Sequence, residues 1–260
     1  MSNIYREYFE TLKNYLLILK IDANKEICGC NDDEIKKLES EKGKIPLAYE
    51  EYLRSIGKKF LFQFMDAENM AFEDLEYINE FADEVFTNNS QKFEKSIFVI
   101  SERRNDYISL IYADEENPKV WIMSEYWDEE NGENLSLRTS SLTDLMNVFF
   151  EQTLRNHPFS FHFVSEEVVD TKKHIKDLYT DWFNNILKVK QYIEDTKYST
   201  HENSLIVHLN YILLDYYELN RSEINKILNP EQYIPNQTES IDNETTKKDN
   251  IIQRVLKMFK

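Results

Sequence analysis

The stretch from Asp32 to Gly57, DDEIKKLESEKGKIPLAYEEYLRSIG, constrains the fold more than any other part of the chain. It predicts two short helices, because apolar residues recur at helical spacing on one side of each half. Gly43 separates the halves, and glycine tolerates the left-handed conformation that ends many helices. Pro46 then begins the second helix, where its fixed φ suits the backbone and its missing amide costs nothing. We therefore predict a helix–corner–helix unit whose buried side consists of Ile35, Leu38, Tyr49, Tyr52, Leu53 and Ile56.

The order of these parts resembles the opening pattern of the SUKH superfamily. The resemblance rests on the helix EIKKLE, the glycine, the Ile45-Pro46 pair, the aromatic pair in YEEYL and the closing Ile56-Gly57. It covers roughly residues 28–156 and extends more loosely to strand pairs near 95–125 and to the helix SSLTDLMNVFFEQTL. Ile45-Pro46 stands where the family usually has Leu-Pro, and Ile56-Gly57 stands where it has an Asn-Gly-type turn.

The SUKH superfamily includes bacterial immunity proteins of toxin systems and a yeast cell-wall regulator. Its bacterial branch implies a non-catalytic inhibitor that binds a toxin, often a nuclease, and blocks the toxin's active site. The yeast branch implies the alternative, a scaffold or regulatory interaction module without a toxin partner.

Three later runs, at 96–101, 107–112 and 120–123, are rich in β-branched and aromatic residues and predict strands. Their short connections predict an antiparallel meander, with a fourth strand at 134–139. An apolar run at 60–65 also has the length of a strand. The predicted fold class is α+β: an antiparallel sheet of about four to six strands flanked by helices, plus a C-terminal helical hairpin.

The domain organisation follows from shifts in composition along the chain. Residues 1–160 are expected to form a SUKH-like α+β domain with an added N-terminal helix. Residues 161–228 contain neither glycine nor proline. The spacing of their apolar residues predicts a helical hairpin that packs on the first domain or on the opening helix. Residues 229–250 are polar and are interpreted as a flexible linker, and residues 251–260 as a short basic amphipathic tail.

The chain carries a net charge of −17. Residues 1–160 hold 18 Lys and Arg against 32 Asp and Glu, a difference of −14, so the acid is concentrated in the family-like part. This field disfavours direct binding to nucleic acid or to anionic membranes and favours a basic protein partner. No apolar run is long enough to span a membrane and the N-terminus lacks a signal-peptide pattern, so a cytoplasmic location is expected.

Two acidic stretches are the candidate partner-binding residues. The first, at 60–91, contains no Lys or Arg, and the second, at 114–133, contains Lys119 alone. Charge runs often form only solvated surfaces, but a carboxylate-rich surface also steers a basic partner, and aromatic residues within it would hold the complex. The candidates are Glu73, Asp74, Glu76, Glu80, Asp83, Asp114, Glu115, Glu116, Tyr126, Trp127, Asp128, Glu129 and Glu130.

The sequence offers no signature of an enzyme. With 4 glycines it contains no phosphate-binding loop, and its 5 histidines show no i, i+4 pair. Cys28 and Cys30 are expected to be reduced, partly buried thiols, because a bridge across one residue is strained. His208 is expected in the core or at an interface. We therefore predict no catalytic residue, cofactor or metal, and the sequence leaves the oligomeric state and the toxin's identity open.

Overall fold

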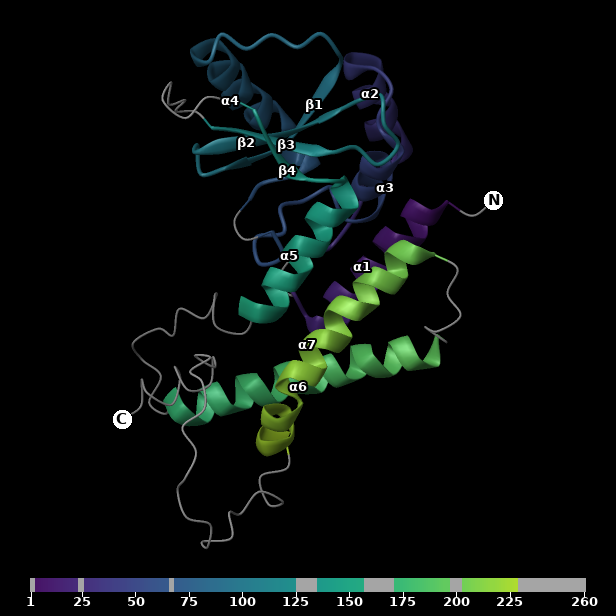
Figure 1. The fold of residues 1–260 in the computed structure, drawn as a ribbon, viewed down its shortest axis with the longest axis vertical. Coiled ribbons are helices and arrows are strands. Elements are labelled where there is room, and N and C mark those ends of the chain that lie inside the picture. The colour runs from purple at the N-terminus through teal and green to yellow at the C-terminus, as the bar shows by residue number, and fades with distance from the viewer. Residues whose placement is uncertain are drawn as a thin grey trace, which may run out of the picture. The chain divides into compact units, whose positions relative to one another are not determined.

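The computed structural model describes residues 3–22, 26–65, 68–124, 135–156, 171–196 and 203–228. These residues form one sheet with helices beside it, and α6 and α7 lie farther from the sheet (Figure 1). The order of elements is α1 (Ile4–Leu19), α2 (Asp32–Lys42), α3 (Leu47–Ser55), the 3-10 turn η1 (Phe72–Asp74), α4 (Leu75–Asn88), β1 (Ile97–Arg103), β2 (Tyr107–Tyr112), β3 (Val120–Ser124), β4 (Ser136–Thr139), α5 (Leu142–Asn156), α6 (Thr171–Asp195) and α7 (Ser204–Leu228).

The sheet is an antiparallel meander with the strand order β1-β2-β3-β4, as the strand runs predict. Its register sets Leu110 opposite Trp121 and Trp121 opposite Leu137, so these three side chains share one face. On that face Val99, Ile108 and Met123 form a small core with α4. On the other face Phe98, Ile111 and Val120 join the larger core, to which α1, α3 and α5 also contribute. The predicted α+β class is confirmed.

The helix–corner–helix unit is also confirmed. Asn31 caps α2, because its side chain accepts from the amides of Asp33 and Glu34 while Glu34 bonds back to the Asn31 amide. Gly43 ends α2 at φ +91°, and α3 begins directly after Pro46. The predicted buried residues of both helices are all buried.

Gly29 has a structural role that the sequence pattern does not reveal. Residues 28–30 run against the end of α3, where the Cys30 amide donates to the Leu53 carbonyl at 2.8 Å. A Cβ at position 29 would lie 1.7 Å from the Arg54 carbonyl oxygen, so only glycine permits this approach. Residues 28–30, which precede α2, therefore belong to the same packed unit as α2 and α3.

The apolar run at 60–65 forms turns, so the strand that its length suggested is wrong. Leu61, Phe64 and Met65 are nevertheless buried. The buried Asp22 carboxylate accepts from the amides of Gln63 and Phe64 at 3.1–3.2 Å. These bonds satisfy the backbone without a strand partner, which allows the run to be buried as turns.

The helical hairpin packs on both expected neighbours. α6 and α7 contact each other and α1, and α7 also contacts α5. The Asn203 side chain caps α7 and donates to the Ile4 carbonyl at 2.7 Å, and the buried Tyr15 hydroxyl donates to Asn210. α7 extends to Leu228. Residues up to 228 form one compact unit by their contacts, and the boundary at residue 160 stays a prediction.

Some of the sequence expectations lie outside the described residues. These are the linker at 229–250 and the basic tail at 251–260. Within the described parts of the chain, no helix combines the length and the apolar character that a membrane span requires.

Candidate partner-binding surface

The first acidic stretch forms the exposed side of α4. Ile78, Phe81, Ala82 and Val85 turn toward the sheet and are buried, and this spacing leaves the acidic residues between them on the opposite side. Glu73, Glu76, Glu80, Asp83 and Glu84 are all exposed, whereas Asp74 is half-buried and accepts from the Asn69 amide group at 3.0 Å. We call the exposed residues Glu73, Glu76, Glu80, Asp83 and Glu84 the α4 acidic face.

The carboxylates of the α4 acidic face form no close ion pairs. Over the described ranges, none of its five carboxylates forms an ion pair with a Lys or Arg. Lys42 reaches α4, but its ammonium contacts the Asn79 amide oxygen at 3.5 Å. Unpaired carboxylates on one helix face project a negative potential into solvent, which attracts a basic molecule.

The C-terminal end of α4 adds a shallow, open hollow to this face. Asp83, Glu84, Thr87 and Asn88 line it. The last carbonyl groups of a helix carry partial negative charge, so here the backbone adds to the two carboxylates. The hollow therefore suits a cationic side chain.

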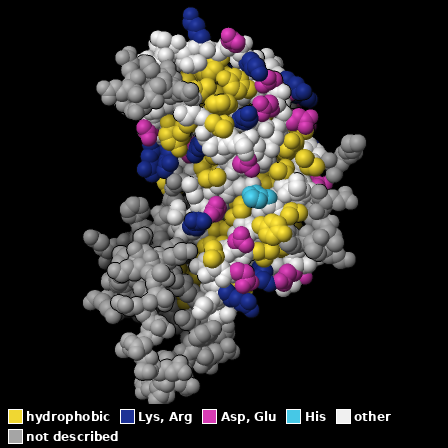
Figure 2. Space-filling model, in the orientation of Figure 1, with side chains coloured by type: hydrophobic (Ala, Val, Ile, Leu, Met, Phe, Trp, Pro, Cys, Tyr) yellow, Lys and Arg dark blue, Asp and Glu magenta, His cyan; other side chains and the backbone are white. Residues whose placement is uncertain are grey.

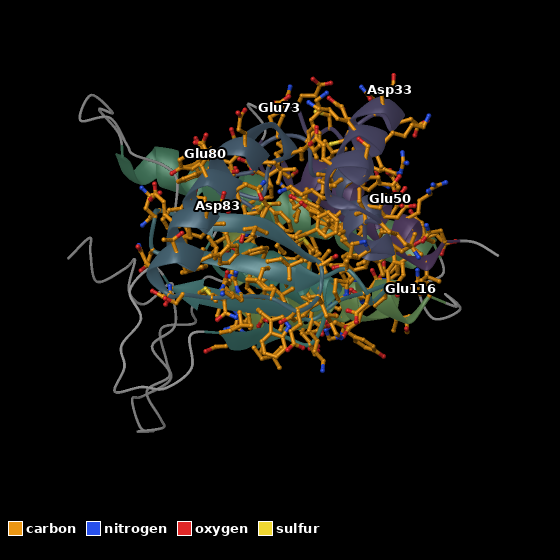
Figure 3. The ribbon with its side chains drawn as sticks, turned by 90° about the horizontal axis from the view of Figure 1, so that it is seen from above. Asp33, Glu50, Glu73, Glu80, Asp83 and Glu116 are labelled. Carbon is orange, nitrogen blue, oxygen red and sulfur yellow. The ribbon has the colours of Figure 1, made fainter. Side chains whose placement is uncertain are left out.

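The second acidic stretch lies elsewhere. Asp114, Glu115 and Glu116 are exposed in the hairpin between β2 and β3, which packs on the start of α3 through a bond from the Ala48 amide to the Glu116 carbonyl at 2.8 Å. Figure 3 shows Glu80 and Asp83 on α4 and Glu73 in the turn before it, whereas Glu116 lies apart from them, on the same side of the view as Glu50. The structure thus brings the first set together and separates it from the second.

Asp114 differs from the carboxylates of α4 because it has a cation. Lys95 donates to it at 2.7 Å, and this hydrogen bond and the positive charge lower the pKa of Asp114. The remaining candidates of this stretch, Tyr126, Trp127, Asp128, Glu129 and Glu130, lie outside the described residues. Their role in binding stays a prediction.

Glu68 belongs to the first acidic stretch by sequence, but it is only 1% exposed. Its carboxylate accepts from Arg138 at 2.6 Å, from Ser109 at 3.1 Å, from Tyr107 at 3.2 Å and from Ser101. The Arg138 guanidinium also lies 5.5 Å from the ring centres of Tyr107 and Phe149. This network ties the segment before α4 to three strands and to α5, so Glu68 supports the fold and adds nothing to the surface charge.

Sequence reasoning missed this network, although one signal was present. Ser101 and Ser109 interrupt otherwise apolar strands, and a polar side chain at an inward position needs a buried partner. The partner comes from a loop and from β4, and the pattern of the strands alone does not identify either.

The residues considered for chemistry occupy ordinary positions. Cys28 and Cys30 are unbridged, and burial raises the pKa of the Cys30 thiol to about 12, so this thiol stays protonated. His208 is exposed on α7, so the expectation that it lies in the core is wrong, and its place at an interface stays a prediction; α7 turns Leu209 and Asn210 inward instead. No group of three or more His, Cys, Asp or Glu side chains in the described ranges is arranged to hold a metal ion.

Comparison with known families finds one match. Residues 29–148 match the model of the SMI1 / KNR4 family (SUKH-1). The match spans α2 to the first half of α5, and it confirms the SUKH resemblance over this segment. No curated protein and no solved structure matches the chain.

Proposed function

We propose that this chain, whose residues 29–148 match the SUKH-1 family, is a non-catalytic immunity protein that neutralises a basic protein toxin. The observation that carries the proposal is the α4 acidic face, whose five exposed carboxylates form no ion pair with a Lys or Arg among the described residues. Exposed carboxylates without an ion-pair partner are available to another molecule. The family match supports a protein as that molecule.

The charge favours a particular kind of toxin. Nucleases are basic where they grip phosphate, so a carboxylate surface competes with the nucleic acid for the same groups. The net charge of −17 repels nucleic acid from the chain itself, so the inhibitor does not bind the substrate of its target. We therefore propose a nuclease domain as the partner and the cytoplasm as the place where the complex forms.

Electrostatic recognition also raises the rate at which the inhibitor associates with its partner. Steering by opposite charge raises association rates by roughly 10- to 1,000-fold, and it disfavours acidic partners. A protein that must capture a toxin before it acts gains most from the association rate. The α4 acidic face is well placed for this because its charges stand on a helix that the sheet holds in position.

The first test identifies the partner. The tagged chain is purified from its native cells, co-purifying proteins are identified by mass spectrometry, and the most basic of them is expressed with and without the chain. We expect this partner to arrest growth and co-expression of the chain to restore it. A bound partner that is harmless to cells would contradict immunity and favour the scaffold or regulatory module.

The second test assigns the surface. Glu76, Glu80 and Asp83 are changed together to Lys in one variant. The matched control changes Asp177, Asp181 and Asp215, three exposed acids of α6 and α7, and alters the net charge equally. We expect the α4 variant to lose protection and the control to keep it. Equal loss in both would mean that only the overall charge matters.

A further inference from the structure

Exposed charge on this chain is mixed in sign. On the face that Figure 2 shows, Lys and Arg side chains lie among Asp and Glu side chains. Exposed acid in such surroundings is weak evidence of a ligand site. A carboxylate that is buried without a cation is stronger evidence, because the loss of its hydration costs free energy that an ion pair would otherwise offset. One such carboxylate is that of Glu102.

Glu102 is the last buried residue of β1 and is 7% exposed. It lies opposite Ile108 in the sheet, so its side chain shares the face on which Ile108 packs against α4. Its carboxylate accepts from the Asn105 amide at 3.2 Å. Within the described ranges it forms no ion pair with a Lys or Arg.

The charged groups that act on Glu102 are acidic. Burial raises the pKa of Glu102. The negative charges of Glu68 and Asp74 raise it further, and the hydrogen bond from the Asn105 amide opposes them. Glu68 is already paired with Arg138 at 2.6 Å, whereas Asp74, immediately before α4, forms no ion pair with a described Lys or Arg. These neighbours oppose the charge of Glu102 and do not neutralise it.

The two cationic residues that follow Glu102 do not supply the missing charge. Arg103 is the next residue of β1 and so points to the opposite face, where it donates to the Tyr107 hydroxyl at 3.3 Å. Arg104 is exposed in the β1–β2 turn and forms no ion pair with a described carboxylate. Glu102 is thus a buried carboxylate without an ion pair at the end of a strand.

An exposed aromatic ring stands beside this carboxylate. Tyr77 on α4 is 46% exposed, and its hydroxyl donates to the Asn105 side chain at 2.6 Å. Asn105 therefore contacts both groups, Glu102 through its amide and Tyr77 through its side chain. Its φ of +57° is left-handed, a conformation that asparagine adopts more readily than most residues. We call Asp74, Tyr77, Glu102 and Asn105 the Glu102 site.

The Glu102 site is complementary to one long cationic side chain. The face of an aromatic ring attracts a cation, and a recessed carboxylate accepts charge-assisted hydrogen bonds. Arginine suits the site better than lysine, because its guanidinium stays charged when buried, is more weakly hydrated and stacks on aromatic rings. A metal ion suits it less well, since no three His, Cys, Asp or Glu side chains of the described chain are arranged to hold one.

We propose that the Glu102 site receives one arginine side chain of the basic partner, which stacks on Tyr77 and donates to Glu102 and Asp74. This inference rests on the proposed function and deepens it. The α4 acidic face reaches the site, because Glu80 lies one helical turn from Tyr77. The acidic face speeds the encounter, and the buried carboxylate holds the complex once the partner supplies its cation.

The stability of the free chain separates a binding carboxylate from a structural one. Glu102→Gln keeps an acceptor for the Asn105 amide and removes the charge. We expect it to raise the urea midpoint at about pH 7, with a smaller gain at about pH 4, because a carboxyl whose pKa is raised by folding destabilises the fold only above that pKa. Glu68→Gln, which leaves Arg138 without its partner, should lower the midpoint. A lower midpoint for Glu102→Gln would overturn the proposal, since Glu102 would then have a cation within the fold.

Binding is tested on the full nitrogen-15-labelled chain with a defined probe. The probe is the blocked tripeptide GRG, and its controls carry lysine or citrulline, the neutral isostere of arginine, in place of the arginine. The backbone amide resonance of Asn105 reports on the site. We expect a saturable shift with GRG, weaker binding of the lysine peptide and no saturable shift with the citrulline peptide. An Asn105 resonance that GRG does not move, or moves no more than the citrulline peptide does, would overturn the proposal.

Three variants localise the binding of GRG. Glu102→Gln should weaken it about tenfold, because a charge-assisted hydrogen bond is lost. Tyr77→Leu, at an exposed position that folding tolerates, should weaken it about threefold. Glu80→Gln removes the same charge from the α4 acidic face and should weaken it by no more than about twofold. Equal effects of Glu102→Gln and Glu80→Gln would mean that only the overall charge matters, and the site would be wrong.

The outcome is separable from that of the proposed function. If the chain protects cells from a toxin, and Glu102→Gln protects them equally and GRG leaves Asn105 unmoved, the site is wrong and the immunity role stands. If GRG binds at Asn105 and no toxic partner exists, the site stands as one for an arginine side chain and the immunity role falls.

Discussion

α3 and α4 are both amphipathic helices rich in acid, but the structure uses their charges differently. The acids of α3 are paired within the fold: Glu50 with Arg54 at 2.8 Å, and the buried Glu51 with Arg6 at 3.3 Å. α4 buries only its apolar side, and its exposed carboxylates form no ion pair with a described Lys or Arg. The comparison teaches that acid content alone does not mark a binding surface. The informative property is the set of exposed Asp and Glu side chains that form no ion pair within the folded chain.

The largest expected effect is on the α3 side of this comparison. Leu53 is fully buried in the main core, so Leu53→Ala should lower the free energy of unfolding by about 2–5 kcal/mol. Urea denaturation measures this loss. A loss below about 1 kcal/mol would mean that α3 does not pack as described.

The buried ion pair should come next. Arg138→Met leaves the Glu68 carboxylate buried without its cation, which should cost about 3 kcal/mol, the low end for such pairs because the Arg138 side chain is 18% exposed. Adding Glu68→Met should recover part of the loss. Thermal and urea unfolding of the single and double variants provide the measurement. A double variant that is less stable than either single variant would contradict the account.

A smaller effect separates two neighbouring tyrosines of α3. The Tyr52 hydroxyl donates to the Met70 carbonyl at 3.0 Å, whereas the buried Tyr49 hydroxyl has no partner among the described residues. Tyr52→Phe should therefore cost about 1 kcal/mol, and Tyr49→Phe should be neutral or slightly stabilising. Paired urea melts compare them directly. Equal losses would indicate that Tyr49 has a partner after all.

The smallest expected effect on stability lies on α4. Glu76→Lys, Glu80→Lys and Asp83→Lys should each change the free energy of unfolding by no more than about 0.5 kcal/mol, because these side chains are exposed and unpaired. Urea melts of the three single variants test this. A loss above about 1 kcal/mol in any of them would show that folding does use these charges.

The elements of the fold were predictable where local pattern and tertiary environment agree. The strands at 97–112 and the α2–α3 unit follow from β-branched runs, from Gly43 and from Pro46, whose effects act within a few residues. The turns at 60–65 were not predictable, because the side chain that stabilises them, Asp22, lies about forty residues earlier.

The candidate site was predictable only in outline. The absence of Lys and Arg from 60–91 located the α4 acidic face, but the same stretch contains the buried Glu68, whose partner Arg138 lies in β4. Which acids stay unpaired depends on contacts between distant residues.

The central claim is that the unpaired carboxylates of α4 steer a basic partner, and the association rate tests it most directly. Stopped-flow or surface plasmon resonance kinetics with the identified partner are compared at two salt concentrations for the native chain, the Glu76/Glu80/Asp83 reversal and the matched Asp177/Asp181/Asp215 reversal. Salt screens such charges over roughly 8 Å at physiological strength. The account predicts that the α4 reversal slows association at least about tenfold and flattens its salt dependence, with dissociation nearly unchanged. An association rate that is the same for both reversals would contradict it.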